Sequence, residues 1–172
     1  MTTYHDFSLA EDARDIQLTA WSLDPERSSV EFEVPGLSTV RGRFHRYQGT
    51  LDLRREPAIE LTIEAASVDT GNRRRDKHLR SKTFFDVEAQ PLVVFLSDSA
   101  TLDGDQLTVA GGLSAANHSE PLRLVATLRR VGSELEIEAT TEVDQRRLGM
   151  TYRMLGVIGT PTRLSVRGRL VR

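Results

Sequence analysis

The sequence has 172 residues, of which 38% are hydrophobic and 28% are charged, a size and composition typical of one soluble globular domain. The formal net charge of -2 provides no positive field for a polyanion, so nucleic-acid binding is not expected. No stretch is long and apolar enough for a membrane-spanning helix. The chain contains no cysteine, which excludes disulfides, thiolate catalysis and zinc sites with sulfur ligands.

The first 20 residues are rich in acidic side chains and show no firm periodicity. They contain no basic segment followed by an apolar one, the pattern of a secretory signal, so a cytoplasmic location is expected. We predict a flexible arm over residues 1–20, with a helical turn around Leu9 to Ile16. Residues 21–172 are predicted to form the folded domain.

From Val30 onward the dominant period is two, as in strands with one apolar face and one solvated face. Ile59, Leu61 and Ile63, for example, alternate with glutamate and threonine. Asp103-Gly104 and Gly132-Ser133 are typical of tight turns between such strands. The pattern predicts strands near 21–34, 39–53, 57–69, 91–101, 106–113, 120–131, 134–146 and 161–172.

One segment, 72–82, departs from this pattern and predicts a short helix with Asn72 as its N-cap. Arg73, Arg74 and Arg75 would lie at the positive end of the helix dipole, which is unfavourable for cations, so tertiary contacts must hold this helix. Eight antiparallel strands could form either a sandwich or a closed barrel, and periodicity does not choose between them. Several strands are longer than usual, which suits a tall barrel.

The stretch from Ser67 to Ser97 carries the most specific pattern in the chain. It resembles the signature of the YceI-like family, and the resemblance extends to Trp21, Val40, Gly42 and Phe44. The matching residues within the stretch are Asp69, Thr70, Gly71, Asn72, Arg75, Asp76, His78, Leu79, Arg80, Ser81, Phe84, Phe85, Asp86, Pro91, Phe95 and Ser97.

This resemblance implies an all-β fold: an eight-stranded antiparallel lipocalin-like β-barrel with one short helix between strands 3 and 4. It also implies a function, because members of the family carry an isoprenoid or similar lipid inside the barrel. We therefore expect this protein to bind a long-chain lipid of the quinone or polyprenyl type, as a carrier or store. The sequence leaves the interior either filled by side chains or open to one slim ligand.

If the interior is open, the apolar faces of the strands supply its lining. The candidates are Phe32, Val34, Phe44, Ile59, Leu61, Ile63, Phe84, Val93, Phe95, Leu124 and Ile137. The resemblance implies that Arg75, Asp76 and His78 lie near the barrel entrance, where they are candidates for contacts with a lipid head group. An alternative interpretation, which we favour, gives Arg75 and Asp76 structural hydrogen bonds that hold the helix over the barrel.

No catalytic residues are expected, because no nucleophile, acid-base pair or phosphate-binding loop has the required spacing. The four histidines are scattered without metal-ligand spacing, so neither a metal nor a cofactor is expected. Leu92, Val94 and Leu96 should face outward from their strand, which predicts a covered surface and suggests a homodimer. The rival interpretation of the chain is a protein-interaction module with a filled barrel and no lipid ligand.

Overall fold

The computed structural model describes residues 4–36, 38–150 and 161–172, which form one sheet of ten antiparallel strands with two α-helices and two short 3-10 helices. The strands are β1 (Trp21–Val34), β2 (Val40–Phe44), β3 (Tyr47–Leu51), β4 (Ile59–Glu64), β5 (Val68–Asp69), β6 (Leu92–Asp103), β7 (Gln106–Ala115), β8 (His118–Val131), β9 (Glu134–Val143) and β10 (Thr162–Val171). The helices are α1 (Tyr4–Leu18), α2 (Arg73–Arg80), η1 (Ala65–Ser67) and η2 (Gln145–Leu148).

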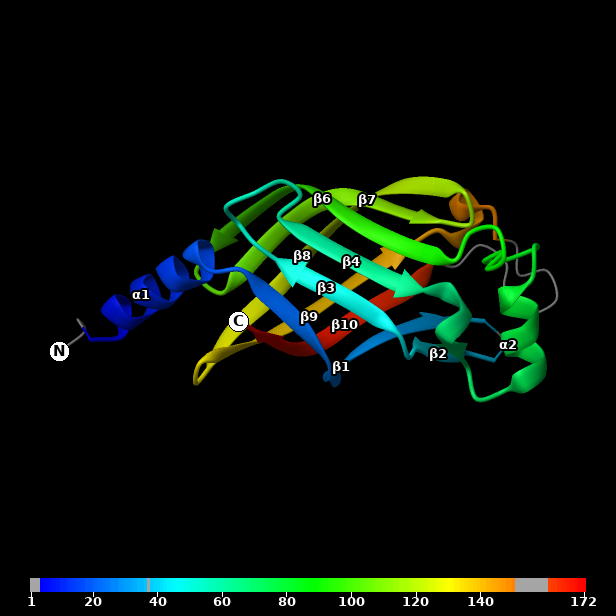
Figure 1. Cartoon of the computed structure of the whole chain (residues 1–172), viewed down its shortest axis with the longest axis horizontal. Coiled ribbons are helices and arrows are strands. Elements are labelled where there is room, and N and C mark those ends of the chain that lie inside the picture. Colours follow the sequence, from blue (N-terminus) through cyan, green and yellow to red (C-terminus); the bar gives the residue numbers. More distant parts are fainter. Residues whose placement is uncertain (1–3, 37, 151–160) are drawn as a thin grey trace.

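The sheet closes on itself as a barrel. Its strands follow the order β10-β9-β8-β7-β6-β4-β3-β1-β2-β5, and an additional pairing of β1 with β10 joins the sheet into a ring. The long strand β1 pairs with β3 through Trp21 and Ser22 and with β2 from Val30 to Val34. Figure 1 shows α1 at one end of the barrel and α2 at the other.

The predicted eight-stranded antiparallel barrel is confirmed, because the ten strands occupy eight positions around it. The predicted strand 39–53 is one such position, broken into β2 and β3 at His45 and Arg46. The predicted strand 57–69 is another, broken into β4 and β5 by η1. The remaining strands lie within a few residues of their predicted bounds, which is the usual precision of strand ends.

Both helices occupy the predicted places. The side chain of Asn72 accepts a hydrogen bond from the Arg75 amide and caps α2, as expected from the sequence. At the N-terminus α1 runs over Tyr4–Leu18, longer than the predicted turn. The flexibility of this arm stays a prediction. Residues 151–160 of the predicted barrel domain lie outside the described residues.

The closing pair of strands contains a bulge, because the register between β1 and β10 shifts between Asp24 and Ser29. The hydroxyl oxygen of Ser28 accepts a hydrogen bond from the Arg169 amide at 3.2 Å. This approach requires glycine at position 168, where a Cβ atom would lie 2.1 Å from that oxygen. The phenol of Tyr47 donates to the Ser28 carbonyl at 2.6 Å and fixes the bulge from β3.

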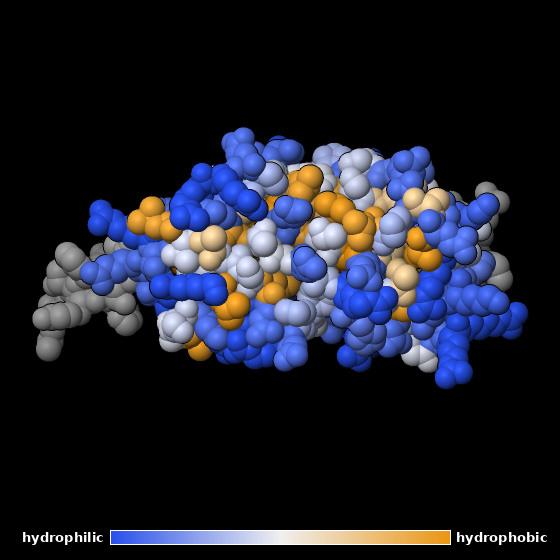
Figure 2. Space-filling model, viewed as in Figure 1, coloured by the Kyte–Doolittle hydropathy of each residue, from blue (hydrophilic) through white to orange (hydrophobic). Residues whose placement is uncertain are grey.

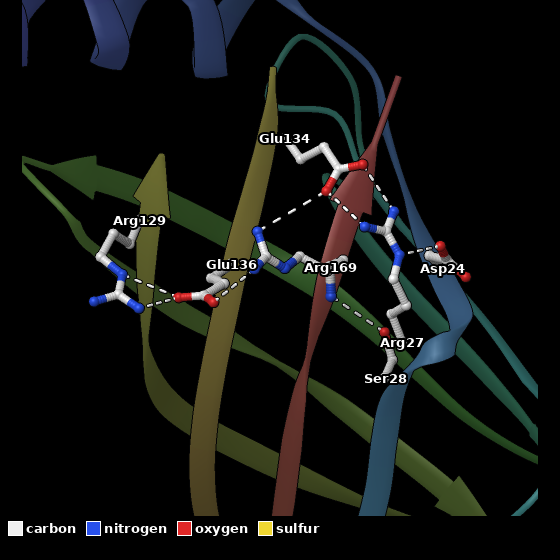
Figure 3. Close-up of polar contacts among 7 residues, drawn as sticks. All are labelled: Asp24, Arg27, Ser28, Arg129, Glu134, Glu136 and Arg169. Atoms are coloured by element: carbon white, nitrogen blue, oxygen red, sulfur yellow. Dashed lines mark hydrogen bonds and ion pairs between the residues drawn. The ribbon is translucent and has the colours of Figure 1, made fainter. Parts of the chain in front are cut away.

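An ion-pair network crosses the outside of the barrel beside this bulge (Figure 3). Arg27 donates to both oxygens of Glu134 at 2.9 and 2.8 Å and to Asp24 at 2.8 Å. Arg169 bridges Glu134 and Glu136 at 3.9 and 3.1 Å and so links β10 to β9. The Arg27 guanidinium lowers the pKa of Glu134, so this carboxylate stabilises the fold above its ordinary pKa and loses that contribution as the pH falls.

The barrel is packed solid at the end where α1 lies. Trp21, Leu107, Leu128 and Leu135 keep at most 2% of their surface exposed. The guanidinium of Arg130 stacks over the Trp21 ring at 5.6 Å. Arg130 also pairs with Asp12 and Asp15 of α1, and these contacts join the helix to the barrel.

We predict that Tyr47→Phe lowers the free energy of unfolding by about 1 kcal/mol at neutral pH, because it removes the hydrogen bond to the Ser28 carbonyl. Burial, together with the charges of Asp24 and Glu31, raises the pKa of Tyr47. A raised pKa stabilises the fold below the ordinary value of about 10 and loses that contribution as the pH rises through the folded-state value.

Urea unfolding of both proteins at pH 7 and at pH 10.5 tests this prediction. The wild type should lose more stability than Tyr47→Phe between the two values. Equal losses would show that the phenol does not titrate with folding.

Candidate functional site

A cavity of about 180 Å³ lies inside the barrel. Its lining is apolar on almost every side and includes Leu23, Val30, Phe32, Phe44, Leu51, Ile59, Leu61, Ile63, Phe85, Val93, Phe95, Leu113, Ala115, Leu122, Leu124, Ala126, Ile137, Ala139, Val143, Leu148, Met150, Leu164, Val166 and Leu170. Strand alternation places those that lie on strands on the inner face of the sheet, whereas Phe85, Leu148 and Met150 lie outside the strands.

The interior is hollow rather than filled. Ile137, Leu164 and Val166 line the cavity on the inner faces of β9 and β10, yet each is only partly buried. A tightly packed interior leaves few voids larger than a water molecule. The partial burial of inward-facing side chains therefore indicates unfilled space between opposite walls of the barrel.

Most of the predicted lining residues border this cavity: Phe32, Phe44, Ile59, Leu61, Ile63, Val93, Phe95, Leu124 and Ile137. Two predicted residues, Val34 and Phe84, do not. Val34 is fully buried near the end of β1, beyond the reach of the cavity. Phe84 follows α2 and packs against the ring of His78 at 4.8 Å, and its neighbour Phe85 lines the cavity instead.

Aromatic side chains form the wall next to α2. The rings of Phe32 and Phe44 lie 5.6 Å apart, and those of Phe44 and Phe85 lie 5.7 Å apart in an edge-to-face arrangement. Phe32 also covers Gly42, where a Cβ atom would lie 2.3 Å from the ring. Glycine at this position therefore lets Phe32 lie flat against β2.

The helix η2 covers the barrel beside β8 and supplies lining residues that the sequence analysis did not identify. The ladder between β8 and β9 runs only from Ala126 and Ala139 to Val131 and Glu134. Beyond it, η2 packs against β8 and directs Leu148 into the cavity. Part of the barrel wall is thus a short helix rather than a paired strand.

Both ends of η2 are fixed by capping. The Asp144 carboxylate accepts from the Arg146 amide at 3.0 Å, and Gly149 takes a left-handed conformation with φ of 75°. The amide of Met150 donates to the Gln145 carbonyl at 3.0 Å. These contacts hold Gln145 and Met150 at the cavity wall. In the sequence, this capped helix is indicated by an aspartate five residues before a glycine. That signal is weak on its own.

Two neutral polar side chains meet at the same end of the cavity. The Thr162 hydroxyl donates to Oε1 of Gln145 at 3.1 Å, and the two side chains are 7% and 4% exposed. Thr141 also lines the cavity, and its hydroxyl donates to the Arg123 carbonyl at 3.2 Å. Among the described residues, no lysine, arginine or histidine lines the cavity.

The predicted entrance residues serve the attachment of α2. Both contacts of the Arg75 guanidinium go to Thr70, at 2.8 Å to its hydroxyl and 3.0 Å to its carbonyl. The buried carboxylate of Asp76 accepts from the amide and hydroxyl of Thr70 at 2.9 and 2.6 Å. His78 is exposed. The structure thus brings Arg75 and Asp76 together around Thr70, and none of the three predicted entrance residues lines the cavity.

The outer surface of the barrel carries fewer apolar side chains than the cavity wall. Figure 2 shows a largely hydrophilic face with hydrophobic side chains gathered along its middle. Leu92 and Leu96 of β6 are 45% and 42% exposed, as predicted for outward positions.

Within the described residues, no group of His, Cys, Asp and Glu has the geometry of a metal site. None of the helices in this part of the chain has the length and apolar character to cross a membrane.

A closed antiparallel barrel around an apolar cavity defines a lipocalin-like protein, a class that encloses small hydrophobic ligands. The YceI-like domain model matches residues 21–170, and the chain belongs to this family. The predicted family is therefore confirmed.

Known relatives agree with this assignment. Protein YceI from Escherichia coli O157:H7 is 36% identical over 115 residues, which cover 63% of this chain and 60% of that protein. The chain thus spans 60% of the length of this relative.

Two solved structures share the fold. BcnA from Burkholderia cenocepacia aligns with a TM-score of 0.76 at 16% identity and covers 87% of this chain and 99% of its own. A polyisoprenoid binding domain from Saccharophagus degradans, implicated in plant cell wall breakdown, aligns with a TM-score of 0.72 at 15% identity over 88% and 97% of the two chains.

The hollow interior predicts that the same substitution is tolerated at one alanine and destabilising at another. Ala139 lines the cavity, whereas Ala65 is 1% exposed and does not border it. Ala139→Leu should leave the free energy of unfolding nearly unchanged because the larger side chain enters empty space. Ala65→Leu should cost about 1 to 3 kcal/mol through overpacking. Urea unfolding measures both, and equal costs would indicate that the interior is filled.

Proposed function

We propose that this protein binds an isoprenoid or similar long-chain lipid, of the quinone or polyprenyl type, inside the barrel and acts as its carrier or store without catalysing a reaction. The apolar cavity is the observation that supports this function most directly. The polyisoprenoid-binding structural neighbour supports the same class of ligand. The hollow interior favours this function over the rival, an interaction module with a filled barrel.

The size of the cavity constrains how a lipid would bind. Its 180 Å³ is close to the engineered cavity of about 150 Å³ that holds benzene, and smaller than the roughly 300 Å³ of small ligand pockets. About six carbons in that space would gain about 5 kcal/mol, at about 0.8 kcal/mol each. This gain only matches the lower end of the association cost, about 4 kcal/mol. Useful affinity therefore requires a longer chain and an interior that widens around it.

The two ends of the barrel differ, and this difference gives the ligand a direction. Fully buried side chains such as Trp21 and Leu135 block the end near α1. At the opposite end the wall is completed by η2, whose short segment is held by its caps rather than by a strand ladder. The lipid tail would extend from this end toward Leu51 and Leu170.

Affinity should rise with chain length if the tail supplies the binding free energy. Geraniol, farnesol and geranylgeraniol share an isoprenoid alcohol and differ only in length. We expect each added isoprene unit to tighten binding severalfold, measured by displacement of N-phenyl-1-naphthylamine from the purified protein. Equal affinities would indicate that the barrel does not widen beyond its present cavity.

A blocked cavity should abolish this binding. Val166 lines the cavity, whereas Val125 faces outward and is 51% exposed. We predict that Val166→Trp eliminates geranylgeraniol binding and that the matched control Val125→Trp binds as the wild type does. Circular dichroism establishes that both variants fold. Wild-type binding by a folded Val166→Trp variant would place the ligand outside the barrel.

The ligand itself can be sought in protein purified from bacteria under gentle conditions. Comparison of native and denaturing mass spectra, followed by analysis of the organic extract, should reveal a stoichiometric isoprenoid released on denaturation. A protein that is free of lipid and stays so after incubation with quinones and polyprenols would favour the interaction module. A cytoplasmic location and a homodimer stay predictions.

A further inference from the structure

Helix α2 turns opposite faces toward the barrel and toward solvent. Its buried residues are Asp76 and Leu79, which lie three apart and therefore on one side of the helix. Arg73, Arg74 and Lys77 are exposed and share the other side, because residues three and four apart are neighbours on a helix surface. Since α2 lies across the end of the barrel opposite α1 (Figure 1), this basic face of α2 is directed outward from that end.

The cations of this segment divide into two groups. Arg75 donates to Thr70, and Arg80 donates to two carbonyls that precede the helix, so these two guanidinium groups hold α2 in place. The side chains of the basic face, and Lys82 in the turn that follows, make no hydrogen bond and no ion pair within the described part of the chain. Structure therefore leaves four cations free at this end of the barrel.

The remainder of the chain does not neutralise these four cations. The residues outside the described ranges contain no aspartate or glutamate, so no carboxylate there could pair with them. Helix α1 carries several acids, but it lies at the other end of the barrel. There Asp12 and Asp15 pair with Arg130 and Arg172, so the charges of that end compensate one another.

A positive excess also remains within the segment itself. Six cationic and three acidic side chains lie between residues 72 and 88. Of the three acids, Asp76 is buried and bonded to Thr70. The other two, Asp86 and Glu88, follow the helix and reduce the local charge without cancelling it.

The basic face lowers the stability of the helix that carries it. Arg73 and Arg74 lie in the first turn, where the positive end of the helix dipole disfavours cations. Arg73 and Lys77 are like charges four residues apart, which is also destabilising. Within the described residues no partner offsets either cost. Side chains that oppose the local structure without compensation are expected where a function requires them.

We propose that the basic face of α2, together with Lys82, docks this protein on an anionic lipid bilayer. Charge complementarity identifies the partner, because each lysine or arginine beside an anionic bilayer surface strengthens binding about fivefold. Leu79 is turned into the protein, so the helix offers no apolar residue on this face for insertion. The contact is therefore electrostatic and reversible.

A bilayer suits this arrangement better than a nucleic acid does. The eight residues of α2 span about 12 Å, too short for a basic stripe that follows a phosphate backbone. The net charge of -2 gives the rest of the protein no positive field to extend such a stripe. A helix that lies across the end of a barrel can instead place its free cations against a flat surface.

Docking through α2 would bring the cavity wall close to the bilayer. Phe85 follows α2 and lines the cavity, and its ring contacts that of Phe44. A carrier of membrane lipids could exchange its ligand from this position. That consequence rests on the proposed function, whereas docking itself concerns the outer surface and does not.

Cosedimentation with vesicles tests the proposal on the purified protein. One vesicle contains phosphatidylcholine alone, and the other contains phosphatidylcholine and phosphatidylglycerol in equal parts. We expect binding to the second vesicle only, and loss of that binding in about 1 M NaCl, where the Debye length falls to about 3 Å. Equal binding to both vesicles, binding that salt does not weaken, or no binding to either would overturn the proposal.

Arg74→Glu combined with Lys77→Glu reverses two charges of the basic face and should weaken binding to the anionic vesicle more than about 100-fold. Arg74→Gln alone should weaken it about fivefold. Arg55→Glu combined with Arg123→Glu is the matched control, because it reverses two exposed arginines of the β3–β4 turn and of β8 and changes the net charge equally. This control should keep most of the wild-type affinity, and an equal loss would show that net charge alone governs binding.

Two further measurements separate docking from the proposed function. Circular dichroism establishes folding, and displacement of N-phenyl-1-naphthylamine by geranylgeraniol without vesicles should be the same for the wild type and the double variant, because neither Arg74 nor Lys77 lines the cavity. Loss of geranylgeraniol binding by the folded variant would overturn the docking role, since α2 would then act on the barrel. A wild-type protein that binds anionic vesicles but no isoprenoid would refute the proposed function and leave docking intact.

A nucleic-acid partner would give a different result. Binding of duplex DNA that depends on Arg74 and Lys77, without binding to anionic vesicles, would assign the basic face to a polyanion other than a bilayer and overturn the proposal.

Discussion

The pairing of β1 with β10 is the constraint on which the rest of this structure depends, because it joins the sheet into a ring and encloses the interior. The bulge between Asp24 and Ser29 interrupts the register of this pairing. The hydroxyl of Ser28 bonds to β10 across it, and Tyr47 secures its carbonyl from β3. The ion pairs of Arg27 and Arg169 add a second link on the outside.

Closure produces a space that the side chains leave unfilled, and that space has a cost. At about 24 cal/mol per Å³, a void of 180 Å³ corresponds to about 4 kcal/mol of lost packing. This is a large fraction of the stability of an ordinary domain, about 5 to 15 kcal/mol. A ligand that fills the space would restore those contacts, so binding and folding stability are coupled in this barrel.

The sequence predicted much of this architecture because a strand with one buried face repeats every two residues. That repeat was sufficient to place Ile59, Leu61 and Ile63 correctly, and all three line the cavity as alternation requires. Closure itself came from the family resemblance, since a sandwich has the same periodicity. Alternation alone wrongly predicted Val34 as a lining residue. It indicates which face of the sheet a side chain lies on, but not its position along the barrel axis.

The polar part of the site was harder to predict. Gln145 lies in η2, outside any repeating pattern, and Thr162 begins a strand 17 residues later. The antiparallel pairing of β9 with β10, which places Thr162 opposite Val143, brings them together. Phe84 and Phe85 show the same limit, because they are identical in type and adjacent in sequence, and the turn after α2 decides which one reaches the cavity.

The arginine-rich helix shows why charge in a sequence does not by itself define a binding site. The sequence alone leaves Arg75 and Arg80 available for an anionic head group, but in the structure both donate to the chain that leads into α2. The buried Asp76 fixes Thr70 in the same arrangement. This helix opens with three arginines at its unfavourable end, so such contacts are what keeps it folded. The guanidinium groups of Arg75 and Arg80 thereby hold α2 to the chain that precedes it.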